Sequence, residues 1–130
     1  MDATAAPFHT RTVIIGAHLL LYSRDPAADR AFLRDVLGWP WVEDAASEPG
    51  WLIFRMPPAE VGVHPSDGEP MAELHLMCDD IHATVADLAA RDVPITEIVD
   101  EGYGLATTVT LPSGATLGLY EPRHPVALDL

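Results

Sequence analysis

The sequence predicts a single α+β domain over residues 1–130, built from a β-α-β-β-β arrangement that occurs twice. Each half of the chain has an apolar run, then a capped amphipathic helix, then three short segments of strand-like composition. The halves run from about residue 12 to 65 and from about 72 to 123. The 130 residues, 48% of them hydrophobic, are enough to form one compact core.

The first half begins with "TVIIGAHLLLYS" at 12–23, whose branched apolar residues predict a buried strand. A helix follows, with Asp25 as its N-cap, Pro26 at its first position and Gly38 at its end. Three further segments, separated by turn-forming residues, predict a meander of strands: "WPWVED", "GWLIFRMP" and "EVGVHP".

The second half repeats this order. "ELHLMC" at 73–78 predicts a strand, and Asp79 or Asp80 can cap the helix "IHATVADLAARD". The last three segments predict strands: "PITEIVD", "LATTVTLP" and "ATLGLYEP". The spacing between the caps of the two helices also separates His18 from Glu73, so these two residues occupy equivalent positions in the two first strands.

Composition and charge exclude several classes of function. A net charge of −13 leaves no basic surface for nucleic acid and would repel an anionic membrane. The longest apolar run is interrupted by His18 and is too short to span a bilayer, and the N-terminus does not resemble a signal peptide. A single cysteine allows no disulfide within the chain. We therefore expect a cytoplasmic protein that binds neither nucleic acid nor membranes.

Three stretches carry a resemblance to a known family: "GAHLLLYSRDPAADRAFLRDVLGW", "ELHLMCDDIHATVADLAARDV" and "LPSGATLGLYEPRHP". Together they resemble the vicinal oxygen chelate superfamily, which includes glyoxalase I, extradiol dioxygenases, and the bleomycin- and fosfomycin-resistance proteins. The resemblance implies a cup-shaped mixed sheet formed by two βαβββ modules, with the helices on its outer face. It also implies four metal-ligand positions, one on the first and one on the last strand of each module.

In this chain the four positions fall on His18, Gly62, Glu73 and Gly118. Because glycine has no side chain, His18 and Glu73 would form an incomplete metal site, whereas a catalytic zinc ion usually has three protein ligands. We therefore expect no resident cofactor. The alternative is a divalent ion (Zn²⁺, Ni²⁺, Fe²⁺ or Mn²⁺) held by His18 and Glu73 with a recruited histidine. Without a metal, the same two residues are candidates for an acid–base catalytic pair.

The two glycines also predict an opened cup in which a ligand can lie directly against the sheet. Strand alternation places other polar or aromatic side chains on the same faces, and tryptophan and tyrosine can serve as walls. The residues expected to bind the ligand are His75, His64, Trp51, Tyr103, Tyr120, Gly62 and Gly118. The stretch "DEGYG" is a candidate mobile loop over the mouth of the cup.

Other polar residues have simpler interpretations. Cys78 shares a face with apolar residues and is expected to be a small core side chain. Glu121 lies on the opposite face from Gly118 and is expected to be an edge or surface carboxylate. His9, His82 and His124 are expected to be exposed and are given no role.

Several functions remain open at this point. The preferred one is a small-molecule-binding protein of the glyoxalase/bleomycin-resistance type, which binds an aromatic or apolar organic ligand and works as a homodimer. An alternative is a metal-dependent enzyme, a glyoxalase-like lyase or isomerase or an extradiol-type dioxygenase. A third is metal-free acid–base catalysis by His18 with Glu73. The last is a regulatory module that binds a partner protein.

Overall fold

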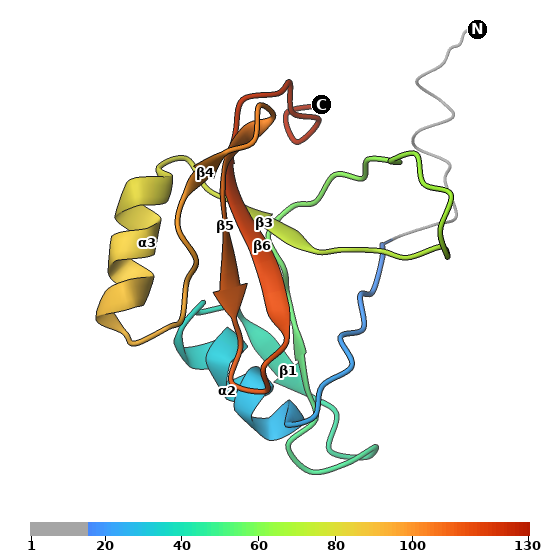
Figure 1. Cartoon of the computed structure of the whole chain (residues 1–130). Helices are drawn as coiled ribbons and strands as arrows, with labels where there is room; N and C mark the ends of the chain where they lie inside the picture. Colours follow the sequence, from blue (N-terminus) through green and yellow to red (C-terminus); the bar gives the residue numbers. More distant parts are fainter. Residues whose placement is uncertain (1–15) are drawn as a thin grey trace, which may run out of the picture.

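The computed structural model describes residues 16–130 and has an α+β architecture (Figure 1). Within these residues two helices and six strands follow one another in the chain: α2 (Pro26–Asp35), β1 (Trp41–Glu43), β2 (Leu52–Phe54), β3 (His75–Met77), α3 (Ile81–Ala90), β4 (Val99–Asp100), β5 (Gly104–Thr110) and β6 (Thr116–Pro122). No helix in this part of the chain is long and apolar enough to cross a membrane.

The larger sheet belongs entirely to the second half of the chain. Its strand order is β3-β6-β5-β4, with β3 parallel to β6 and the other neighbours antiparallel. In the register, His75 lies beside Gly118 and Gly118 lies beside Thr108, so these three residues form a row across the sheet. The predicted order of strands and helix is thus confirmed for this half.

Both helices begin at the predicted caps. Asp25 Oδ1 accepts a hydrogen bond from the Ala28 N–H at 3.2 Å, and Asp80 Oδ1 accepts one from the Ala83 N–H at 3.1 Å. The start of α3 has a second acceptor, because Glu121 Oε1 receives the Ile81 N–H at 3.0 Å. The prediction that Glu121 is only an edge or surface carboxylate was therefore wrong. Its carboxylate accepts a hydrogen bond from an amide that has no partner within the helix, and its negative charge interacts favourably with the helix dipole at the N-terminus.

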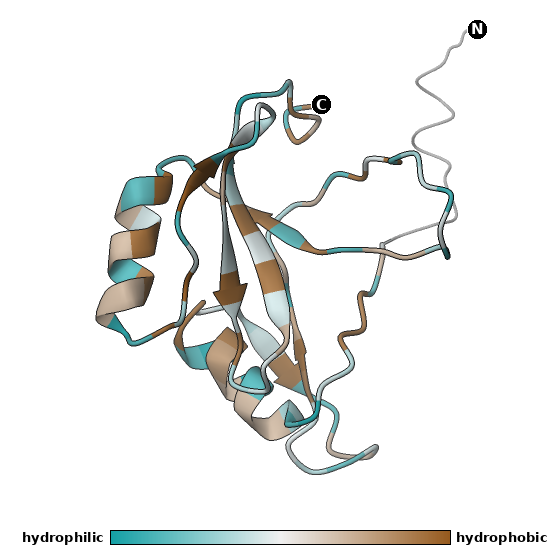
Figure 2. Cartoon of the chain, viewed as in Figure 1, coloured by the Kyte–Doolittle hydropathy of each residue, from teal (hydrophilic) through white to brown (hydrophobic). Residues whose placement is uncertain are grey.

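The hydrophobic core lies between the larger sheet and the two helices. Figure 2 shows apolar residues alternating with polar ones along β6, as expected for a sheet with one covered face. The core joins both halves of the sequence, since Phe32 of α2 packs with side chains of α3, β5 and β6 and of the segments beside them: Leu88, Val93, Val109, Leu111, Leu117 and Leu119. Cys78 packs at the margin of this core, as predicted.

The first half of the sequence forms fewer strands than expected. The segments 16–23 and 60–65 contain no strand, and their apolar side chains are exposed, 90% for Val61 and 96% for Val63. The strand prediction was therefore wrong there, while residues 12–15 of the first predicted strand lie outside the described residues. A segment forms a strand only where its backbone N–H and C=O groups pair with a neighbouring strand. In this structure β1 and β2 pair only with each other, so neither gives segments 16–23 and 60–65 a partner.

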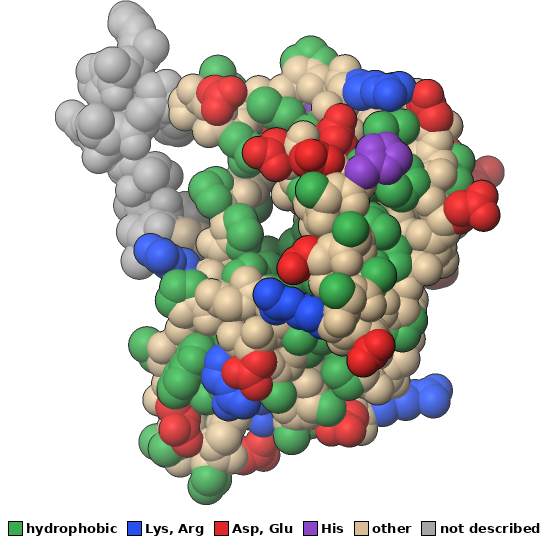
Figure 3. All heavy atoms as spheres, turned by 90° about the vertical axis from the view of Figure 1, so that its left-hand side faces the viewer, with side chains coloured by type: hydrophobic (Ala, Val, Ile, Leu, Met, Phe, Trp, Pro, Cys, Tyr) green, Lys and Arg blue, Asp and Glu red, His purple; other side chains and the backbone are tan. Residues whose placement is uncertain are grey.

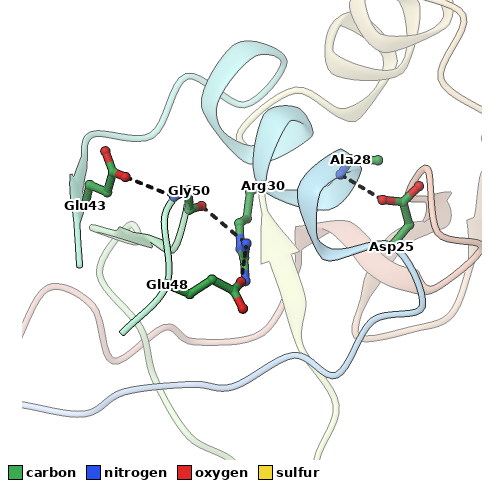
Figure 4. A network of polar contacts seen from close by, with 6 residues as sticks. All are labelled: Asp25, Ala28, Arg30, Glu43, Glu48 and Gly50. Atoms are coloured by element: carbon green, nitrogen blue, oxygen red, sulfur yellow. Dashed lines mark hydrogen bonds and ion pairs between the residues drawn. The ribbon is translucent and has the colours of Figure 1, made fainter. Parts of the chain in front are cut away.

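The short β1–β2 hairpin is fixed to α2 by one arginine (Figure 4). Arg30 lies 4.8 Å from the ring centre of Trp51, and its Nη1 donates to the Gly50 carbonyl oxygen at 3.3 Å. The same nitrogen lies 3.5 Å from Glu48, while the Glu43 carboxylate accepts the Gly50 N–H at 2.9 Å. The cation–π interaction with Arg30 holds Trp51 against the helix, and the other contacts hold the turn beside it.

Candidate functional site

A shallow hollow of about 150 Å³ lies on the larger sheet, and the three residues of the register row contribute to its floor and walls. His75, Gly118 and Thr108 come from β3, β6 and β5 and point away from the helix-covered face by strand alternation. Tyr103 closes one end, and the carboxylates of Glu97 and Glu101 border the opening. The remaining lining residues are Thr96, Val99, Ala106 and Thr107.

The glycine at position 118 creates space, but a side chain of this chain fills part of it. A methyl group built on Gly118 would overlap the His75 imidazole, with Nδ1 its nearest atom and Cε1 and Cγ at 2.8 Å. The imidazole therefore occupies the space that a side chain at position 118 would fill. A ligand can reach this part of the sheet only beside the His75 ring, which makes the imidazole a wall of the hollow.

Glu73 contacts His75, with 3.1 Å between Glu73 Oε1 and His75 Nε2. His18 is exposed, and within the described residues it forms no hydrogen bond or ion pair with Glu73. No three His, Cys, Asp or Glu side chains gather closely enough in residues 16–130 to hold a metal ion. The catalytic and metal assignments of His18 and Glu73 stay predictions.

The other predicted ligand-binding residues divide into two groups. His75, Tyr103 and Gly118 line the hollow, and Tyr120 lies between two of these, its ring centre 6.2 Å from that of His75 and 5.5 Å from that of Tyr103. The other group lies away from the hollow in this structure and consists of Trp51, Gly62 and His64. Trp51 packs on Arg30, whereas Gly62 has open space around it.

A polar group beside the hollow was missed by the sequence analysis. The Tyr120 hydroxyl and His124 Nε2 are 2.8 Å apart, and Glu60 Oε2 lies 3.9 Å from the same nitrogen. Glu60 Oε1 also accepts the Ala127 N–H at 2.7 Å, so this carboxylate holds the C-terminal residues. Burial first, and then the negative charge of Glu60, raise the pKa of Tyr120. Tyr120 and His124 lie four residues apart, whereas Glu60 comes from a distant segment, so no local pattern marks the whole group.

The turn "DEGYG" is held by several contacts instead of lying free. The Asp100 carboxylate accepts the Gly102 N–H at 3.0 Å and the Arg123 guanidinium at 2.9 Å. The first of these bonds, followed by the arginine, lowers the pKa of Asp100. The Arg123 N–H also donates to the Tyr103 carbonyl oxygen at 2.8 Å. These bonds fix the backbone that carries Tyr103 into the hollow.

A second hollow of about 460 Å³ lies between the ends of β3 and β6 and the C-terminal residues, and Cys78 is among its walls. Burial raises the pKa of the Cys78 thiol, so the thiol stays protonated at neutral pH and is a poor nucleophile. This agrees with its predicted role as a small packing residue.

Neither the known family models nor the curated protein sequences contain a match to this chain. Solved structures do resemble it. TnmS3, an antibiotic binding protein from Streptomyces sp. CB03234, is 23% identical with a TM-score of 0.62, over 86% of this chain and 99% of that one. A lactoylglutathione lyase from Agrobacterium tumefaciens is 18% identical, with a TM-score of 0.57 over 85% and 95% of the two chains.

The fosfomycin resistance protein FosX from Listeria monocytogenes is 12% identical, with a TM-score of 0.56 over 85% of this chain and 93% of that one. At such identities the likeness concerns the fold and leaves the chemistry of the site undetermined. The predicted resemblance is thereby confirmed at the level of fold, and the chain adopts the vicinal oxygen chelate fold.

Proposed function

We propose that this protein binds a small organic molecule through an aromatic or apolar ring, in the hollow beside His75 and Gly118. The observation that carries the proposal is the hollow itself, with about 150 Å³ of space beside the His75 and Tyr103 rings. A space of roughly 150 Å³ holds one benzene-sized ring. Edge and face contacts with aromatic side chains favour such a ring over an aliphatic chain.

The proposal includes a larger cup completed by the first half of the chain and by a second copy of the protein. Pockets for drug-sized ligands usually enclose about 300–1,000 Å³, so this hollow accommodates only part of such a molecule. The exposed apolar segments 19–22 and 61–63 offer surface for completing it. In this view the chain is one cytoplasmic domain with modules at about residues 12–65 and 72–123, and it functions as a homodimer.

TnmS3, described as an antibiotic binding protein, supports a binding role for the same fold. The competing proposal is a metal-dependent lyase, isomerase or dioxygenase that uses His18 and Glu73. It is supported by a fold shared with the lactoylglutathione lyase and by the Glu73–His75 contact, which places a carboxylate and an imidazole together. The binding role is preferred because no three His, Cys, Asp or Glu side chains gather in the described residues, whereas a catalytic zinc ion usually has three protein ligands.

The test is a screen of aromatic metabolites and antibiotics by thermal shift, followed by mapping of each hit with amide chemical shifts. Hits should perturb the amides of Gly118 and Thr108. The variant Thr108→Phe should abolish binding by filling the hollow, since Thr108 lines it. Thr110→Phe is the matched control, on the same face of the same strand but outside the hollow. Hits that survive Thr108→Phe, or the absence of any hit, would contradict the proposal.

The dimer has a separate test. Sedimentation of the 14.0 kDa chain should give twice its mass at micromolar concentration, and Val63→Asp should shift the equilibrium towards the monomer. Asp67→Ala, an exposed change nearby in the same segment, should leave the mass unchanged. A monomeric parent protein would exclude the dimer and leave the ligand-binding proposal in place.

A further inference from the structure

We propose that the hollow selects ligands that present hydrogen-bond donors, such as ring-bearing amines and phenols, and rejects carboxylates and phosphates. This inference rests on the proposed function and assigns a chemical class to its ligand. It follows from the directions of the hydrogen bonds around the hollow, because a polar group whose proton is already used inside the protein can only accept from a ligand.

His75 is the first group whose role as donor or acceptor is fixed. Its Nε2 lies 3.1 Å from Glu73 Oε1, and an ionised carboxylate can only accept a hydrogen bond. Nε2 of the neutral ring therefore carries the proton and donates it to Glu73. The other ring nitrogen, Nδ1, is then an acceptor; within the described residues it makes no hydrogen bond, and it is the ring atom nearest to Gly118. This side chain offers an acceptor to a ligand.

Two of the three threonines that line the hollow, Thr96 and Thr107, have hydroxyl protons that are already committed. The Thr107 hydroxyl donates to the Thr96 carbonyl oxygen at 2.6 Å. The two hydroxyl oxygens are 3.1 Å apart, and with the Thr107 proton already used, the Thr96 hydroxyl is the donor to Thr107. Thr96 Oγ1 also accepts the Thr108 N–H at 2.9 Å. Neither hydroxyl proton is left for a ligand.

The hydroxyl proton of Tyr120 is also already used inside the protein. His124 Nδ1 lies 2.7 Å from the Pro125 carbonyl oxygen, which can only accept, so Nδ1 carries the proton. Nε2 is then the acceptor, and the Tyr120 hydroxyl donates to it at 2.8 Å. Burial and the nearby Glu60 raise the pKa of Tyr120, which keeps the phenol protonated and this donation in place at neutral pH.

The charges around the hollow favour the same class of ligand. Glu97 and Glu101 line it, and among the described residues no lysine or arginine does. Arg123, the residue that follows β6, is already paired with Asp100 at 2.9 Å. Figure 3 shows acidic side chains spread over the helix-covered face as well, in keeping with the net charge of −13. An anion entering the hollow would meet negative charge and fixed acceptors.

Two hydroxyls, those of Tyr103 and Thr108, can donate or accept, and they therefore do not set the preference. The selectivity comes from the fixed acceptors and the two carboxylates. A protonated amine would be attracted by Glu97 and Glu101, while a phenol would donate to His75 Nδ1.

The experiment compares four probes that share one ring system: 2-naphthylmethylamine, 2-naphthol, 2-methoxynaphthalene and 2-naphthoate. Each is titrated into the full chain at pH 7.5, and binding is followed by the amide shifts of Gly118 and Thr108. We expect the amine and the phenol to bind at least about tenfold more tightly than the ether and the carboxylate, because a buried unpaired acceptor costs about 1–3 kcal/mol. Binding of the carboxylate as tight as that of the amine would overturn the inference and leave the proposed function standing. If none of the four probes shifts these amides, the proposed function fails as well.

Variants assign the selectivity to particular side chains. Glu101→Gln and Glu97→Gln should each weaken amine binding by roughly three- to fivefold and leave phenol binding unchanged, as expected for a partly exposed charge. Glu69→Gln removes the same charge from an exposed position outside the hollow and serves as the control. A loss of affinity for the amine that is equal in all three variants would show a general charge effect and overturn the assignment to this site.

Discussion

Replacement of Asp29 tests how the two halves of the chain are joined. This carboxylate on α2 is only 7% exposed. Its Oδ2 accepts the hydroxyls of Ser23 and Ser113, each at 2.7 Å, and its Oδ1 accepts the Ser113 N–H at 3.0 Å. Ser113 lies in the turn between β5 and β6, so this one side chain connects the first helix to the larger sheet. Asp29→Ala would leave the Ser113 amide and both hydroxyls without their acceptor.

The expected cost follows from these three bonds. A hydrogen bond to a charged group contributes about 1.5–3 kcal/mol, and water can replace part of that at the half-buried Ser23. The two bonds to Ser113 remain to be counted, so Asp29→Ala should lower the free energy of unfolding by about 3–6 kcal/mol. Asp29→Asn keeps the shape and one acceptor oxygen, and it should lower the free energy by only about 1–2 kcal/mol.

Urea unfolding followed by circular dichroism measures these values. With a slope of about 2 kcal/mol/M, a loss of 3 kcal/mol would lower the midpoint by about 1.5 M. Asp87→Ala is the control, because its exposed carboxylate makes one ion pair, with Arg91 at 3.8 Å, and it should cost about 0.5 kcal/mol or less. If Asp29→Ala unfolds no earlier than Asp87→Ala, the connection through Asp29 contributes nothing and the reasoning is refuted.

Two further predictions concern the hollow and the turn that supports it. Gly118→Ala should destabilise the protein by about 1–3 kcal/mol, because the new methyl group overlaps the His75 ring. In a His75→Ala background most of this cost should disappear, and urea unfolding of the variants measures both values. An equal cost in both backgrounds would exclude the overlap as its cause. The pKa of Asp100 is lowered by the Gly102 N–H and then by Arg123, so its contribution to stability is present above the unfolded-state pKa and is lost as the pH falls through the folded-state pKa. Arg123→Gln should make the urea midpoint less dependent on pH between about pH 2 and 5, and an unchanged dependence would contradict this assignment.

The features that the sequence predicted correctly depend on near neighbours in the chain. The caps Asp25 and Asp80 bind amides three residues on, so their geometry follows from the local backbone. The alternation along β5 and β6 predicted two strands, and the structure contains both.

The features that the sequence did not predict depend on where distant segments meet. His124 could not be recognised as the acceptor for Tyr120 without the turn between them, and Glu60 reaches the same histidine from another part of the fold. Segment 60–65 shows the same dependence on distant partners. Its composition is typical of a strand, but no neighbouring strand pairs with it in this structure.

The sequence by itself determined the two helices and the order of strands and helix in the second half, because capping and hydrophobic periodicity act over a few residues. Only the tertiary structure decided that His75 covers Gly118 and that Glu73 binds His75. It also decided which hydroxyl protons around the hollow are already used. The physical reason is that the direction of a hydrogen bond depends on both partners, and partners such as Thr96 and Thr107 meet only when the chain is folded.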